Sequence, residues 1–192
     1  MSVDSVRVAC PLFQGEGGGS TPTSTLTARA LVFEPCAKLY AVQLVRRWHS
    51  RLPGCQRGPW QYAFHARHGE ATYAVALWNN PCTRSLPEHW LELRRMATAP
   101  DAPKNTASRF LMWMVRYFRA HAPERERCIA YQDTDVHTGT IYKASGWTAA
   151  YTGKRRVRDR SKPRTGTDRM YRSNKNGVAV DAAPKVRWEL EI

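Results

Sequence analysis

The segment "YQDTDVHTGTIYKASGW", residues 131–147, carries the pattern on which the fold prediction depends. It begins like a buried strand and ends like a short helix, and Gly146 suits the left-handed conformation that often ends a helix. Asp133, Asp135 and His137 stand between the two, where the strand gives way to the helix. Ligands of open α/β sheets bind where strand ends and helix starts converge, so the segment predicts both a class of fold and a site.

The rest of the chain alternates between strand and helix patterns. The expected order is a strand in 30–35, a helix in 35–49, two strands in 60–81, a strand in 89–100, a helix in 102–123, a strand in 127–133, a helix in 138–147 and a strand in 147–153. This order predicts an α/β fold with a mixed central sheet flanked by helices.

The composition favours a polyanionic partner, above all nucleic acid. Lys and Arg number 30 against 16 acidic residues in a chain of 192, which gives a formal net charge of +14. No apolar run approaches the roughly 20 residues that span a bilayer, and the N-terminus lacks a signal-peptide pattern. We therefore expect a cytoplasmic protein with no membrane partner. The 5 cysteines are widely spaced without a CxxC pair, which argues against a disulfide framework or a cysteine zinc site.

Composition also divides the chain into three parts. Residues 1–29 are rich in Gly, Ser, Thr and Pro, and we expect them to form a flexible tail. Residues 30–172 hold the periodic segments and form the folded domain. Residues 173–192 are expected to be a C-terminal extension.

Two segments are candidates for contact with nucleic acid. Trp78 and Asn79 end a predicted strand, where Trp would stack on a base and Asn would pair with the edge of adenine. A plain turn is the alternative for this strand end. Arg155, Arg156 and Arg158 belong to a basic, breaker-rich run, in which phosphate contact is favoured over a merely solvated run of charge.

The predicted helix in 102–123 begins with residues suited to an anion. Lys104, Asn105, Thr106 and Ser108 crowd its start. Free backbone N–H groups and the positive end of the helix dipole favour negative charge there, and Lys104 adds a full positive charge. These residues are the candidate binding site for a phosphate-bearing donor; ordinary capping of the helix is the alternative.

The junction after the strand in 127–133 carries acid–base groups. Asp133 and His137 can exchange protons with a substrate, and Tyr142 on the next helix can give one to a leaving group. His49, at the end of the first predicted helix, is a further candidate. The alternatives are structural: Asp133 caps a turn, Tyr142 belongs to the core and His49 complements a helix dipole. No metal is assigned, but an iron site of His49, Asp133 and His137 stays open as an alternative.

Two nested families resemble these segments. "IYKASGW", residues 141–147, resembles the "lYxxxGF" helix that closes the site in the GNAT acyltransferase fold. In that fold, the helix after the fourth strand holds the donor's pyrophosphate; here "PKNTAS" stands where a glycine-rich signature is usual. The narrower resemblance is to the phage Mom family. It rests, within residues 45–150, on "VRRWHSRLP", "LELRRMA", "PKNTASRFL" and the segment quoted first.

These resemblances imply a fold, a function and a site. The fold would be a GNAT-like mixed central sheet flanked by helices, with residues 30–172 as the catalytic domain. The Mom family makes N6-carbamoylmethyladenine in DNA, which protects phage DNA from restriction. We therefore expect a DNA-modifying transferase that acts on the adenine amine in the bacterial host cytoplasm. The resemblance points to His49, Asp133 and Tyr142 as active-site positions.

The sequence leaves alternatives open for the identity of the donor and for the class of function. The donor would be an activated glycyl group, for which glycyl-tRNA is one carrier, or an acyl-CoA. A charged-tRNA donor would fit the large positive charge. The alternative functions are a generic N-acyltransferase that uses acetyl-CoA and a non-catalytic DNA-binding protein that keeps the fold.

Overall fold

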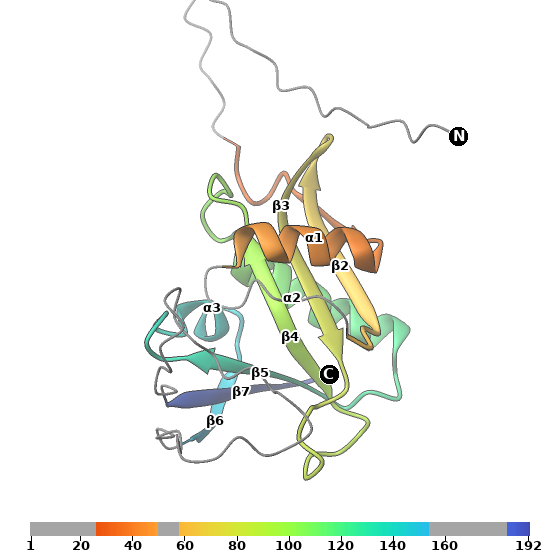
Figure 1. Ribbon diagram of the computed structural model, residues 1–192, viewed down its shortest axis with the longest axis vertical. Helices are drawn as coiled ribbons and strands as arrows, with labels where there is room; N and C mark the ends of the chain where they lie inside the picture. Colours follow the sequence, from red (N-terminus) through yellow and green to blue (C-terminus); the bar gives the residue numbers. More distant parts are fainter. Residues whose placement is uncertain (1–25, 50–57, 154–183) are drawn as a thin grey trace, which may run out of the picture.

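Residues 26–49, 58–153 and 184–192 are described by the computed structural model and form one seven-stranded sheet with helices on both faces (Figure 1). The strands are Val32–Pro35 (β1), Tyr62–His68 (β2), Ala71–Asn79 (β3), Leu91–Thr98 (β4), Arg127–Asp133 (β5), Thr148–Thr152 (β6) and Lys185–Glu191 (β7). The helices are Lys38–Trp48 (α1), Thr106–His121 (α2) and Thr140–Lys143 (α3). The order β1-β2-β3-β4-β5-β7-β6 contains one parallel pair, β4 with β5, so the predicted mixed sheet is confirmed.

Helices α1 and α2 cover opposite faces of the sheet. In Figure 1, α1 crosses in front of β2, β3 and β4, and α2 lies behind them. Val45 of α1 packs in one buried cluster with Leu77, and Phe110 and Phe118 of α2 pack in the other with Trp78. Neighbouring residues of a strand point to opposite faces, so adjacent positions of β3 supply the two clusters.

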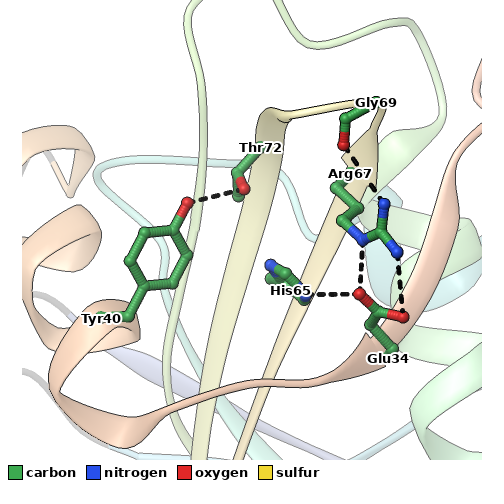
Figure 2. Close-up of polar contacts among 6 residues, drawn as sticks. All are labelled: Glu34, Tyr40, His65, Arg67, Gly69 and Thr72. Atoms are coloured by element: carbon green, nitrogen blue, oxygen red, sulfur yellow. Dashed lines mark hydrogen bonds and ion pairs between the residues drawn. The ribbon is translucent and has the colours of Figure 1, made fainter. Parts of the chain in front are cut away.

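A polar cluster fixes the edge strand β1 to β2 (Figure 2). The carboxylate of Glu34 accepts a hydrogen bond from Arg67 Nε and lies 3.0 Å from His65 Nε2. On the same face, the hydroxyl of Tyr40 in α1 lies 2.8 Å from that of Thr72 in β3. The contacts of Glu34 join the edge strand to β2 and add side-chain bonds to the backbone bonds of a short strand, and the contact of Tyr40 joins α1 to β3.

The last strand, β7, is a correction to the sequence analysis. It lies within residues 173–192, which were expected to be an extension, yet it pairs with β5 on one side and β6 on the other. Its apolar and charged residues alternate, with Trp188 buried in the core and Glu189 accepting a hydrogen bond from Arg127 at 2.6 Å. Charged residues occupy every second position of this segment, and the segment follows a breaker-rich run. Its pattern therefore did not predict a strand.

The packed part of the chain also begins slightly before residue 30. Ala28, within the segment expected to be a flexible tail, is buried, and its carbonyl oxygen accepts a hydrogen bond from Arg109 Nε at 3.2 Å. Residues 1–25 lie outside the described part of the chain.

Candidate active site where two strands diverge

Strands β4 and β5 separate toward their C-terminal ends, and this divergence positions the candidate site. Their parallel pairing runs only from Leu91 beside Cys128 to Leu93 beside Ala130. Beyond that point β4 continues along β3, and β5 continues along β7 as far as Asp133. The chain enters α2 after β4 and α3 after β5, so the starts of both helices follow the diverging strand ends.

A pocket of about 300 Å³ lies at the start of α2 and against α3. Its lining consists of Thr98, Ala99, Pro100, Ala102, Pro103, Asn105, Thr106, Ala107, Ser108, Thr140, Ile141 and Ala144. The hydroxyl of Ser145 donates to the carbonyl oxygens of Ser108, at 3.0 Å, and Ile141, at 2.6 Å, and so fastens α3 to the first turn of α2. The two helix starts identified in the sequence therefore meet at one pocket, whose volume is at the lower end of the range for small-molecule sites.

The start of α2 presents backbone N–H groups instead of a side-chain cap. Asn105 stands at the N-cap with a left-handed φ of 67°, and its side chain makes no capping bond in the described part of the chain. The hydroxyls of Thr106 and Ser108 donate to the carbonyl oxygens of Pro103, at 2.7 Å, and Asn105, at 3.2 Å. The N–H of Thr106 donates to the carbonyl oxygen of Pro103 at 3.2 Å, but the next N–H groups in the first turn of a helix have no intrahelical acceptor, so they can bind an anion. Asn105, Thr106 and Ser108 line the pocket, and the exposed Lys104 precedes them.

A turn at the end of β5 holds Asp133 and His137 together. The carbonyl oxygen of Asp133 accepts the N–H groups of Val136, at 3.1 Å, and His137, at 3.3 Å. Its carboxylate accepts the N–H of Asp135 at 3.2 Å, which is the turn-capping role expected as the alternative. Partial burial lowers the pKa of His137, although the charge of Asp133 opposes this shift. The imidazole is therefore neutral at pH 7 and has a lone pair that can accept a proton.

Tyr142 combines a core position with a place beside His137. Its side chain is only 5% exposed, and its ring stacks on Trp188 with the centroids 5.4 Å apart. The ring centroids of Tyr142 and His137 are 6.4 Å apart. Burial raises the pKa of the phenol to about 12, so the hydroxyl stays protonated at neutral pH and can donate a proton. The residues that line the pocket do not include Tyr142, since Thr140, Ile141 and Ala144 face it from α3.

A buried network that the sequence analysis missed supports this turn. Gln132 donates from Nε2 to the carbonyl oxygen of His137 at 2.6 Å and accepts from Trp188 Nε1 at 2.8 Å. Gly139 has a φ of 77°, and a Cβ there would lie 2.5 Å from Gln132 Oε1 and 2.7 Å from Trp188 Cζ2. The signal for Gly139 was present in the sequence as a glycine directly before a short helix. Gln132 and Trp188 gave no comparable signal, because their pairing depends on β7.

His49 is distant from these groups in the chain and follows a helix on the other face of the sheet. It caps the C-terminus of α1, where its N–H donates to Val45 at 2.9 Å, and α1 packs with the cluster on the other face of the sheet. Tyr142 belongs to the cluster on the α2 face. The structure therefore brings Asp133, His137 and Tyr142 together, and His49 comes from a different layer.

The interpretation of Trp78 as a base-stacking residue is wrong. Its side chain is fully buried, and its Nε1 donates to the sulfur of Met114 at 3.0 Å inside the core. Strand β3 runs antiparallel to β4, so its end at Asn79 pairs with Glu92 near the beginning of β4. The end of β3 at Trp78 and Asn79 therefore lies near the start of β4, whereas the pocket lies at the other end of β4. Strand direction was not available from the local sequence.

The remaining candidates fall outside the described residues. Arg155, Arg156 and Arg158 lie in 154–183, so their predicted phosphate contacts stay predictions. Among the residues that the structure describes, no group of three or more His, Cys, Asp or Glu side chains is arranged to hold a metal ion. In the same part of the chain, no helix has the length and apolar character needed to cross a membrane.

Solved structures with this arrangement define the class of fold. An acetyltransferase of the GNAT family from Desulfovibrio desulfuricans matches with a TM-score of 0.53 and 16% identity, over 84% of this chain and 99% of that one. A Bacillus subtilis acetyltransferase in complex with CoA has a TM-score of 0.53 and 12% identity, over 84% and 99%. The Escherichia coli ribosomal-protein-S18-alanine N-acetyltransferase has a TM-score of 0.55 and 11% identity, over 84% and 94%. The fold is that of the GNAT acyltransferases.

Within that class, the chain belongs to the Mom protein family, whose model matches residues 30–183. No curated protein matches the chain at the level of sequence. The matched range contains the pocket, the start of α2 and the turn from Asp133 to Tyr142. The resemblance stated from the sequence is confirmed for both the family and the fold.

Proposed function

We propose that the protein is a DNA-modifying transferase that converts adenine to N6-carbamoylmethyladenine and so protects phage DNA from restriction. Family membership and the GNAT-like fold support a role in acyl transfer or DNA modification. One structural observation supports the assignment of the site. An uncapped helix start follows β4 where it diverges from β5, and the turn after β5 carries a neutral histidine beside a buried, protonated tyrosine. The net charge of +14 favours a nucleic-acid substrate.

The first step is the transfer of an acyl group to the adenine amine. The amine nitrogen attacks the carbonyl carbon of the donor, and His137, supported by the charge of Asp133, takes the proton that the nitrogen loses. The bond between the carbonyl carbon and the leaving group breaks, and Tyr142 donates its proton to that group. His49 is a second candidate base for the amine. The target base must be unpaired or flipped out of the duplex, which costs a few kcal/mol, roughly.

A glycyl donor accounts for the atoms of the product. Transfer of a glycyl group gives an amide in which a free amine lies next to ring carbon C6. That amine then attacks C6, and the bond between C6 and the original nitrogen breaks. The result is an isomer in which –CH2–CO–NH2 is attached through glycine's nitrogen. No oxidant or reductant is needed.

The donor is proposed to lie against the start of α2, with its negative charge at the N–H groups and Lys104. An acyl-CoA is supported by the CoA complex of the Bacillus subtilis acetyltransferase, which has the same fold. Glycyl-tRNA remains the alternative carrier of a glycyl group. Purified protein supplied with DNA and either glycyl-CoA or glycyl-tRNA separates the two, because only the correct donor yields the modified base.

The decisive test is mass spectrometry of nucleosides from DNA of cells that express the protein. We expect a heavier deoxyadenosine, which disappears for Asp133→Ala and forms more slowly for Tyr142→Phe, when both proteins remain folded. Normal modification by both variants would show that the site is wrongly assigned. Absence of any altered nucleoside with the unmodified protein would refute the function itself.

A generic N-acyltransferase is the second candidate, because the Escherichia coli structural neighbour is a ribosomal-protein-S18-alanine N-acetyltransferase. Tight binding of acetyl-CoA in calorimetry, together with acetylation of a peptide amine and unaltered DNA, would favour this candidate. DNA binding without CoA binding or modification would favour a non-catalytic DNA-binding protein.

A further inference from the structure

A second hollow, of about 760 Å³, runs along α2 beside Leu31 and Phe33 and adjoins the candidate site. We call it the α2 groove and define it by Phe33, Arg109, Trp113, Arg116, Tyr117 and His121. Ser108 and Ala144 line both the groove and the smaller pocket, so the two are continuous. The reaction proposed above has no use for so large a surface if the substrate is a small molecule.

Aromatic rings form one wall of the groove. Trp113, Tyr117 and His121 follow one another at intervals of four residues, which places them on one face of the helix. The rings of Tyr117 and His121 stack with centroids 4.2 Å apart, and those of Trp113 and Tyr117 lie 5.5 Å apart. Trp113 and Tyr117 are only partly buried, unlike Phe118, which the core encloses completely. Flat surfaces of this kind accept stacked bases irrespective of sequence.

Positive charge accompanies the rings. Arg109 and Arg116 are exposed, and each uses its Nε–H on a backbone carbonyl oxygen, that of Ala28 at 3.2 Å and that of Met112 at 3.5 Å. Within the described part of the chain, neither guanidinium forms an ion pair and no acidic residue lines the groove. The Nη groups therefore retain their charge for phosphates.

We propose that the α2 groove binds single-stranded DNA, namely the stretch of the substrate strand next to the base that enters the active site. This inference rests on the proposed function for its choice of DNA. Alternating rings and guanidinium groups match a chain of unpaired bases and phosphates, whereas a duplex keeps its bases stacked inside. The groove shares Ser108 and Ala144 with the pocket proposed for the donor, so a strand bound along the groove would pass next to the group that is transferred.

The test measures binding of a fluorescein-labelled oligothymidylate of about 15 nucleotides to the full chain by anisotropy, at several salt concentrations. Trp113→Ala should weaken binding about tenfold, because one stacked base contributes roughly 1–3 kcal/mol. Arg116→Ala should weaken binding and reduce the salt slope by about 0.7, the value for one lost phosphate contact on a single strand. Lys38→Ala, which removes one exposed charge from α1 on the other face, should leave both unchanged.

Arg116→Ala and Trp113→Phe guard against a simple loss of folding, since the first changes only an exposed side chain and the second keeps a ring. Unchanged affinity and salt slope in Arg116→Ala would overturn the inference. It would equally be overturned if Arg116→Ala lost coenzyme A binding but kept the oligonucleotide, or if ultraviolet crosslinks from a bromouracil oligonucleotide mapped away from Trp113 and Tyr117. Mass spectrometry of DNA separates the two proposals: normal modification without groove binding rejects only the groove. Groove binding without modification rejects only the reaction.

Discussion

Replacing Gly139 by alanine should destabilise the protein strongly, because two separate costs meet at this position. The backbone has a left-handed φ of 77°, which costs an L-residue roughly 1–2 kcal/mol. The new Cβ would also lie 2.5 Å from Gln132 Oε1 and 2.7 Å from Trp188 Cζ2. Neither neighbour can move freely, since Gln132 is bonded to both His137 and Trp188. Overpacking of this kind adds about 1–3 kcal/mol.

Gly69 offers a matched control for the backbone term. Its φ of 56° is also left-handed, but a Cβ there would have no atom within 4 Å. Gly69→Ala should therefore cost only the roughly 1–2 kcal/mol of conformational strain. The difference between the two variants isolates the close approach of Gly139 to Gln132 and Trp188.

Urea unfolding followed by tryptophan fluorescence measures both free energies. We expect Gly139→Ala to lose about 2–5 kcal/mol, against about 1–2 for Gly69→Ala. At roughly 2–4 °C per kcal/mol for a chain of this size, the melting temperature should fall about 5–20 °C for Gly139→Ala. Equal losses in the two variants would refute the argument that the buried network is tightly packed against this turn.

Three further predictions concern ionisable groups. Tyr142→Phe should keep the melting temperature nearly unchanged and slow transfer, as measured by nucleoside mass spectrometry over time. In the unsubstituted protein, the rate of transfer to DNA should rise with pH through a midpoint below 6.5, because burial lowers the pKa of His137 and only the neutral imidazole accepts a proton. Asp133→Asn should lower this midpoint further, because the charge of Asp133 raises the pKa of His137. Glu34→Gln should destabilise the fold more than Glu70→Gln. Since the hydrogen bond from Arg67 lowers the pKa of Glu34, its contribution should be present above the ordinary carboxyl pKa and be lost as the pH falls through the lowered one. Equal unfolding curves for the two Glu variants at pH 7 would contradict the cluster's role.

Local patterns predicted most of the elements but only part of the site. The hairpin of β2 and β3 and the long helix α2 were predicted because their periodicity and turn residues are local properties. Trp78 was misread because its position depends on the antiparallel pairing of β3 with β4, which is a long-range property. Trp188 was not predicted as a core residue for the same reason, since β7, which contains it, is recognisable as a strand only from its pairing with β5 and β6.

The buried state of Tyr142 also bears on the identity of the donor. A phenol with a pKa of about 12 is a much weaker acid than a thiol, whose ordinary pKa is about 8.5, so it gains nothing by protonating a departing CoA thiolate. An alkoxide that leaves a tRNA ester is far more basic and would draw the proton readily. The rate penalty of Tyr142→Phe should therefore be small with a thioester donor and about 100-fold or more with an ester donor. Measuring that penalty with each donor would test whether the tyrosine serves as an acid or only as a part of the core.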